Sequence, residues 1–150
     1  MVETAATIVM SLGSVLLFGY WFRYVCLLTI RTRTAHDYGV EVAEANRLCF
    51  PKVTSGLHKH ERTLRNLDLL YRCLNRDYEI VSYLLKHAGV SPRELRVQRR
   101  ALALEYHFVK MCCRVSRRFS IESSFRAIEE MSLIVAYLAN SFGERAAAGA

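Results

Sequence analysis

The first thirty positions of the chain are almost entirely apolar. No charged residue lies between Thr4 and Phe22, Arg23 interrupts the run, and Val25–Ile30 resume it. A helix that crosses a bilayer needs about 20 consecutive apolar residues, so the pattern predicts a transmembrane helix within residues 1–30. The apolar residues after Arg23 are expected to pack on a partner or on the rest of the chain.

The residues around this run favour a permanent anchor over a cleaved signal peptide. A signal peptide carries Lys or Arg before its apolar core and small residues at its cleavage site. Here Glu3 precedes the run and bulky aromatic residues follow it. Lys and Arg gather on the cytoplasmic side of membrane helices, and Arg23, Arg31 and Arg33 all follow the apolar core. We therefore expect the N-terminus outside and the C-terminal part in the cytoplasm.

Two groups of residues in the predicted anchor indicate contacts. Aromatic side chains around a snorkelling arginine are typical of a membrane interface, and this group is Tyr20, Trp21, Arg23 and Tyr24. Small residues let membrane helices approach closely. Thr7, Ser11 and Ser14 share one helix face and Gly13 is close by, so we expect helix packing at these four residues. The alternative, in which the hydroxyl groups bind only their own backbone, stays open.

Apolar residues at helical spacing continue beyond the anchor. They predict a short helix near residues 37–49, which Pro51 would end because proline disfavours helix at the residue before it. A heptad seam predicts a long helix over about 55–88. The seam consists of Leu57, Leu64, Tyr71, Tyr78 and Leu85, together with His60, Leu67, Leu74, Val81 and Ala88.

Two further long helices follow, each after a recognisable start signal. Ser91, Pro92 and Glu94 match an N-cap, a proline at the first helical position and a capping box. This helix would run to about Arg118 and bury Val97, Ala101, Leu104, Phe108, Met111 and Val115. Ser120 would cap the last helix, and Gly143 would end it. The buried stripe of that helix would be Ser124, Ile128, Met131, Val135, Leu138 and Phe142.

The predicted fold is all-α, with one N-terminal transmembrane helix followed by a cytoplasmic antiparallel bundle of three long helices plus a short helix. Short turns make the long helices antiparallel neighbours. The length of 150 residues suits one modest domain plus an anchor. We expect the anchor at residues 1–30, a connector with the short helix at 31–54, the helical bundle at 55–143 and a flexible tail at 144–150.

Positive charge is concentrated in one predicted helix. Residues 92–118 hold eight Lys or Arg against two acidic residues and so carry +6 of the net charge of +7. A face of one sign attracts acidic protein or anionic lipid headgroups; a solvated face is the alternative. Nucleic acid is disfavoured because no aromatic residues interleave the arginines. The expected basic face, opposite the apolar stripe, consists of Arg96, Arg99, Arg100, Lys110, Arg114, Arg117 and Arg118.

No sequence motif indicates catalysis, a metal site or a bound cofactor. The five cysteines form no C-x-x-C pair, and His58 and His60 point to different faces of a helix. Two pairs of neighbouring carboxylates are expected to face solvent: Asp77 with Glu79, and Glu129 with Glu130. His87 and His107 leave open a weaker hypothesis, in which the bundle carries a macrocyclic cofactor.

The leading hypothesis is a non-catalytic accessory or structural subunit of a larger membrane complex, of which respiratory and photosynthetic assemblies are examples. It would use anchor packing and the basic helical face to contact other membrane subunits, a second copy of itself, anionic lipid or an acidic protein surface. The alternative hypothesis is a membrane-tethered regulator that recruits a soluble acidic protein.

Overall fold

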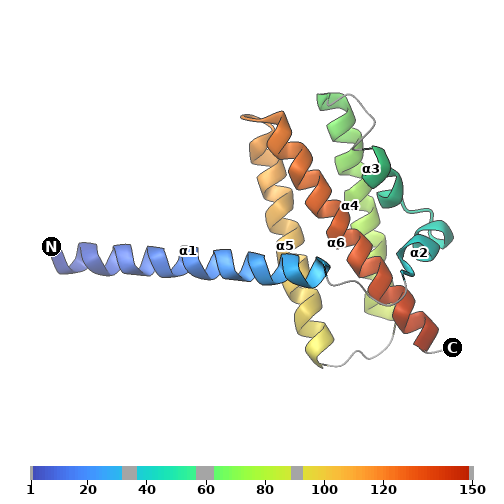
Figure 1. Cartoon of the computed structure of the whole chain (residues 1–150), viewed down its shortest axis with the longest axis horizontal. Coiled ribbons are helices and arrows are strands. Elements are labelled where there is room, and N and C mark those ends of the chain that lie inside the picture. Colours follow the sequence, from blue (N-terminus) through green and yellow to red (C-terminus); the bar gives the residue numbers. More distant parts are fainter. Residues whose placement is uncertain (1, 32–36, 57–62, 89–92, 149–150) are drawn as a thin grey trace. The chain divides into compact units, whose positions relative to one another are not determined.

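The chain is entirely helical, apart from turns, in the part that the structure describes, residues 2–31, 37–56, 63–88 and 93–148 (Figure 1). This computed structural model has six helices over those ranges: α1 (Val2–Arg31), α2 (Gly39–Ala45), α3 (Phe50–Gly56), α4 (Leu64–His87), α5 (Arg93–Ser116) and α6 (Ile121–Ala148). The all-α prediction is confirmed. The chain divides into two compact units, Met1–Arg33 and Thr34–Ala150.

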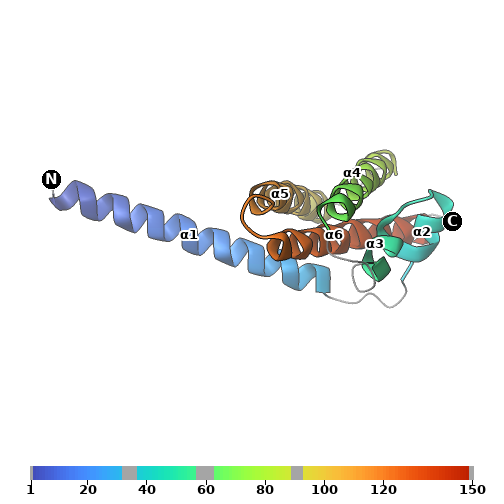
Figure 2. The ribbon, with the colours of Figure 1, turned by 90° about the horizontal axis from the view of Figure 1, so that it is seen from above.

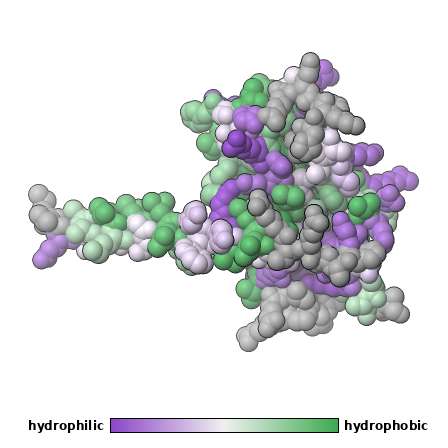
Figure 3. Space-filling model, viewed as in Figure 1, coloured by the Kyte–Doolittle hydropathy of each residue, from purple (hydrophilic) through white to green (hydrophobic). Residues whose placement is uncertain are grey.

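Helix α1 is long and apolar enough to cross a membrane over Glu3–Ile30. Its side chains are apolar on every side: Ile8, Met10 and Leu16 point in different directions, and each is more than half exposed. Figure 3 colours most of the helix as hydrophobic. A helix that is apolar all round is typical of a membrane span or a large protein core.

Helix α6 organises the second unit, because it contacts α2, α3, α4 and α5. It runs past all four of these helices (Figures 1 and 2). Its predicted stripe is confirmed at five positions, which are buried: Ser124, Ile128, Met131, Val135 and Leu138. Phe142, the sixth position, is half-buried.

Helices α4 and α5 run antiparallel and touch through large side chains. The rings of Tyr78 and Tyr106 stack with centroids 3.8 Å apart and planes 4° from parallel. The Tyr106 hydroxyl donates a hydrogen bond to the carbonyl of Leu74 over 3.2 Å. Arg99, near the start of α5, donates to the carbonyl of Leu85 near the end of α4. Burial raises the pKa of the Tyr106 phenol, so this hydroxyl remains a hydrogen-bond donor.

The predicted long helix over 55–88 is wrong in its first part. Helix α3 ends at Gly56, and α4 begins at Leu64 after Thr63, whose backbone is extended at φ −101° and ψ 152°. The seam is confirmed in part within α4, where four of its positions are buried: Leu67, Leu74, Val81 and Leu85. Tyr71 and Tyr78 are half-buried, and the prediction is wrong for Leu64, which is 54% exposed. Other predicted features lie outside the described residues, namely Leu57, His58, His60, Ser91 and Pro92.

The prediction that Pro51 ends a helix is also wrong. Pro51 is the second residue of α3, where the N–H that proline lacks has no partner within the helix. The preceding helix, α2, ends earlier, at Ala45. Arg47 then adopts a positive φ of 52°, which turns the chain between the two short helices.

Both short helices are capped by side chains from the long ones. Oδ2 of Asp77 in α4 accepts hydrogen bonds from the backbone amides of Cys49 (2.6 Å) and Phe50 (2.7 Å) at the start of α3. Oδ1 of Asn140 in α6 accepts from the amide of Tyr38, directly before α2, over 2.7 Å. The expectation that Asp77 faces solvent is wrong, because its side chain is fully buried at this cap.

Gly143 does not end the last helix as predicted, since α6 continues to Ala148. The residue is buried, and a Cβ at this position would overlap the Cβ of Tyr38 and press on Val42. A glycine inside α6 therefore lets the start of α2 approach the α6 backbone closely.

Candidate interaction surface

The buried stripe predicted for α5 is wrong, and this error reveals an exposed surface. The residues that α5 buries are Leu102, Tyr106, Val109 and Cys113. Four apolar residues of the predicted stripe are instead more than half exposed; we call them the apolar stripe: Val97, Leu104, Met111 and Val115. Phe108, on the same side, is 45% exposed. Helix α5 thus carries two apolar faces, of which α6 and α4 cover one.

The basic residues of α5, with Arg117 and Arg118 in the turn directly after it, divide into two rows with different surroundings. The inner row contacts α4: Arg99 donates to the Leu85 carbonyl, Lys110 to Oδ1 of Asn75 and Arg117 to Oδ1 of Asp68. The Arg117 hydrogen bond lowers the pKa of the Asp68 carboxyl. These three residues help to join α4 to α5.

The outer row is exposed to solvent and consists of Arg96, Arg100, Arg114 and Arg118. Arg114 also donates a hydrogen bond from Nε to the Tyr71 hydroxyl over 3.1 Å. His107 is exposed on the same side, with its ring edge-on to Tyr78 at 5.9 Å between centroids. Three exposed guanidinium groups therefore lie on α5, those of Arg96, Arg100 and Arg114, and that of Arg118 lies in the turn that follows it.

The outer row borders the apolar stripe. At roughly 100° of rotation per residue, Arg96, Arg100 and Arg114 lie about 20–100° from the stripe, whereas the buried face lies on the far side of the helix. The prediction that the basic residues lie opposite the apolar stripe is therefore wrong for these three arginines. Arg99 and Lys110 of the inner row do lie away from it, at roughly 100–160°. The single acidic residue among the described α5 side chains, Glu105, is buried. The combined face is apolar along one edge and positively charged along the other.

The predicted helix-packing residues of the anchor lie on exposed parts of α1. Thr7 Oγ1 donates a hydrogen bond to the Glu3 carbonyl one turn earlier over 2.8 Å. For this residue the structure therefore shows the alternative in which the hydroxyl binds its own helix backbone. Gly13 has open space where a Cβ would stand. Ser11 and Ser14 are exposed. The space beside Gly13 is what a closely packed membrane helix would need.

The predicted membrane-interface group also lies on α1. Tyr20, Trp21 and Tyr24 are each at least half exposed. Trp21 and Tyr24 meet edge to face, with ring centroids 6.3 Å apart. Arg23 lies between them in sequence and is partly exposed. Amphipathic rings at one level of an apolar helix are typical of a headgroup boundary.

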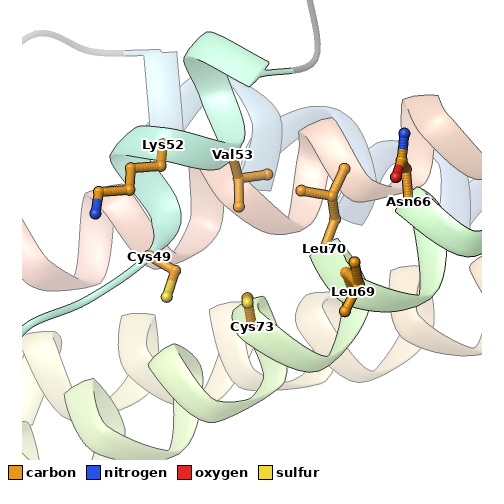
Figure 4. A pocket seen from close by; sticks show the side chains of 7 residues that line it. All are labelled: Cys49, Lys52, Val53, Asn66, Leu69, Leu70 and Cys73. Carbon is orange, nitrogen blue, oxygen red and sulfur yellow. The ribbon is translucent and has the colours of Figure 1, made fainter. Parts of the chain in front are cut away.

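A cavity of about 310 Å³ opens between α3 and α4 (Figure 4). Its lining is mainly apolar, and the sulfur atoms of Cys49 and Cys73 face one another across it. Burial raises the pKa of the Cys73 thiol, and the neighbouring Cys49 adds to this effect. This cavity is not predictable from the sequence, because the two cysteines lie on separate elements, 24 positions apart.

The histidines named for a macrocyclic cofactor are both exposed. His87 packs against the Tyr83 ring at 4.1 Å near the end of α4, and His107 lies midway along α5. Among the described residues, no three His, Cys, Asp or Glu side chains come together as metal ligands would. The surface with the clearest chemistry in the second unit is therefore the outer face of α5, by which we mean the apolar stripe together with the outer row.

The chain matches no protein-family model, no curated protein and no solved structure.

Proposed function

We propose that this chain is a single-pass membrane protein that acts without catalysis, as a structural or accessory subunit of a larger membrane complex. The observation that carries the proposal is the pairing of a long apolar helix, α1, with a compact helical unit that leaves a basic and apolar face of α5 uncovered. In this proposal α1 spans the bilayer and residues 34–150 form a cytoplasmic antiparallel bundle.

The orientation rests on the distribution of positive charge. Arg23, Arg31 and Arg33 follow the apolar core of α1, and no Lys or Arg precedes it. Because Lys and Arg are retained on the cytoplasmic side, the N-terminus lies outside. Protease added to intact cells or spheroplasts should then leave a tag placed after Ala150 intact. Loss of the tag without cell lysis would reverse the orientation.

The subunit role uses two surfaces. Thr7, Ser11 and Ser14 offer one face of small residues to another membrane helix, with Gly13 close by, and close backbone approach there favours association. The outer arginines of α5 offer positive charge to acidic protein or lipid at the membrane surface. Other membrane subunits or a second copy of the chain fit the first surface.

Solubilisation of the tagged chain in mild detergent, followed by affinity purification and mass spectrometry, tests this role. Integral membrane subunits at stoichiometric amounts are expected. Ser14→Leu should release them, because bulk at this position separates the helix backbones, while Leu16→Ile, which alters an exposed apolar residue on the opposite side of α1, should not. Resistance of the chain to extraction by alkaline carbonate checks that the anchor is still inserted.

The alternative is a membrane-tethered regulator that recruits a soluble acidic protein through the exposed arginines of α5. The same purification distinguishes it, because a substoichiometric soluble protein that is lost with Arg100→Glu would then take the place of membrane subunits. The cofactor-carrying bundle is the weaker candidate, since His87 and His107 are both exposed. An absorption spectrum of the purified sample tests it directly.

A further inference from the structure

The apolar stripe of α5 is unusually long for an exposed helix surface. It extends from Val97 to Val115, which at a rise of about 1.5 Å per residue is roughly 27 Å. Large apolar residues continue just beyond the helix, where Phe119 is 83% exposed and Ile121 is 40% exposed. Contiguous exposed apolar surface of this extent indicates a contact that the isolated chain does not contain.

The charge beside the stripe identifies the kind of contact. Arg96, Arg100, Arg114 and Arg118 lie along one edge of it, and the one described acidic side chain of α5 is buried. A helix with apolar residues on one face and arginines beside them is the pattern of helices that lie in the headgroup region of an anionic membrane. Long arginine side chains reach the phosphate groups while the apolar residues enter the acyl boundary.

The candidate anchor makes a lipid surface the best-supported occupant. A domain tethered to a bilayer meets that bilayer at high effective concentration, so even a weak surface contact is populated. An acidic protein or a second copy would also need to match a stripe of about 27 Å bordered by one sign of charge. Anionic lipids rearrange to match such a face without a dedicated partner surface.

We propose that the outer face of α5, with Phe119 at its end, is a peripheral membrane-contact surface that binds anionic phospholipid headgroups and the acyl boundary beneath them. The inference rests on the proposed membrane anchoring by α1. The bilayer then has two roles: it surrounds α1, and its surface is a ligand of the helical domain.

Depth-dependent fluorescence quenching in reconstituted full-length protein tests the proposal. The chain has one tryptophan, Trp21, so a Trp21→Phe background permits a single reporter elsewhere. The Met111→Trp variant places it on the apolar stripe. Tyr83→Trp is the matched control, because Tyr83 is 63% exposed on α4 against 55% for Met111. The reporters are read in vesicles of phosphatidylcholine, alone or mixed with phosphatidylserine, that contain brominated lipid.

In vesicles with phosphatidylserine, the Met111→Trp reporter should be quenched severalfold more than the Tyr83→Trp reporter. Adding Arg100→Glu and Arg118→Glu should reduce that quenching toward the control. Arg72→Glu with Arg76→Glu, an equal charge change at two exposed α4 positions, should leave it unchanged. Equal quenching of the two reporters, or quenching that ignores Arg100 and Arg118, would overturn the lipid assignment.

The wild-type protein, which retains Trp21, tests the membrane anchor separately from the lipid contact of α5. Trp21 of the wild-type protein should be quenched by brominated lipid if α1 is inserted. Absence of that quenching counts against the membrane anchor itself. Quenching of Trp21 without quenching of the Met111→Trp reporter counts against α5 alone. Cross-links between copies at the stripe in that case would assign it to a protein interface.

Discussion

Oδ2 of Asp77 lies 2.7 Å from the backbone amide of Phe50, a residue 27 positions earlier in the chain. It also accepts from the amide of Cys49, so one buried carboxylate satisfies two donors at the start of α3. The second oxygen, Oδ1, is buried with no hydrogen-bond partner among the described residues. This side chain holds a seven-residue helix, too short to be stable alone, against α4.

Asp77→Ala should therefore destabilise the helical unit by about 1–3 kcal/mol, because it leaves two buried amides without an acceptor. Thermal unfolding of the full-length chain in mild detergent, followed by circular dichroism, measures this. Glu79→Ala is the control, since Glu79 is exposed and accepts a hydrogen bond from Asn75 one turn earlier. Equal effects of the two substitutions would contradict the capping role.

The pH dependence of stability provides a second test of Asp77. Burial raises the pKa of this carboxyl above its ordinary value of 3.8, and the two amide hydrogen bonds only partly oppose the shift. The folded state then holds the proton more tightly than the unfolded state. The stabilising effect of protonation is complete below pH 3.8 and is lost as pH rises through the folded pKa.

Asp77→Asn cannot titrate, so its free energy of unfolding should lack this component. The free energy of unfolding of the wild type, measured relative to that of Asp77→Asn, should decrease as pH rises from below 3.8 through the folded pKa. Comparing the two curves cancels Asp68, whose pKa moves in the opposite direction because of Arg117. A difference that is constant with pH would show that Asp77 titrates alike in both states.

Substitutions at Leu74 and Leu104 test which apolar stripes form the core. Leu74 is fully buried, whereas Leu104 is 63% exposed. Leu74→Ala should cost about 2–5 kcal/mol, the range for large-to-small changes in a core. Leu104→Ala should stay within about 0.5 kcal/mol of wild type, as for other surface changes. Melting curves of the two variants check the assignment, which fails if Leu104→Ala is the more damaging.

These two leucines also show how far the sequence predicts the fold. The 3.6-residue spacing of apolar residues identified the buried faces of α4 and α6 correctly. In α5 the same spacing fits Val97, Leu104 and Met111 as well as it fits Leu102 and Val109. Periodicity locates apolar stripes, but it does not show which of two stripes a neighbouring helix covers. The buried stripe of α5 also contains Glu105 and Cys113, which weaken its apolar signal.

The caps of the short helices were beyond prediction for a different reason. Asp77 looks like a surface residue of α4 because the amides it binds belong to residues 49 and 50, which only the tertiary fold brings near. Gly143 resembles a helix stop unless Tyr38 is known to lie against it. The sequence shows the arginines of the outer row as a charged group, but the division into an inner and an outer row depends on where α4 lies.

Gly143→Ala should disturb the docking of α2 on α6, because the added Cβ overlaps that of Tyr38. Overpacking of this kind costs about 1–3 kcal/mol. Hydrogen exchange should become faster in α2 and stay unchanged in the middle of α4. Combining it with Tyr38→Gly removes the clash, so the double variant should be less destabilised than the sum of the two single changes. Strict additivity would show that the two residues do not touch.

The central place of α6 also constrains how the protein is made. This helix follows α2, α3, α4 and α5 in the chain and contacts all of them. The ribosome must therefore translate most of α6 before α2, α3, α4 and α5 can bury the apolar faces that pack on it. Until then those faces are exposed on the growing chain and are substrates for chaperones. If α1 spans the membrane as proposed, its insertion is expected to precede the folding of the helical unit.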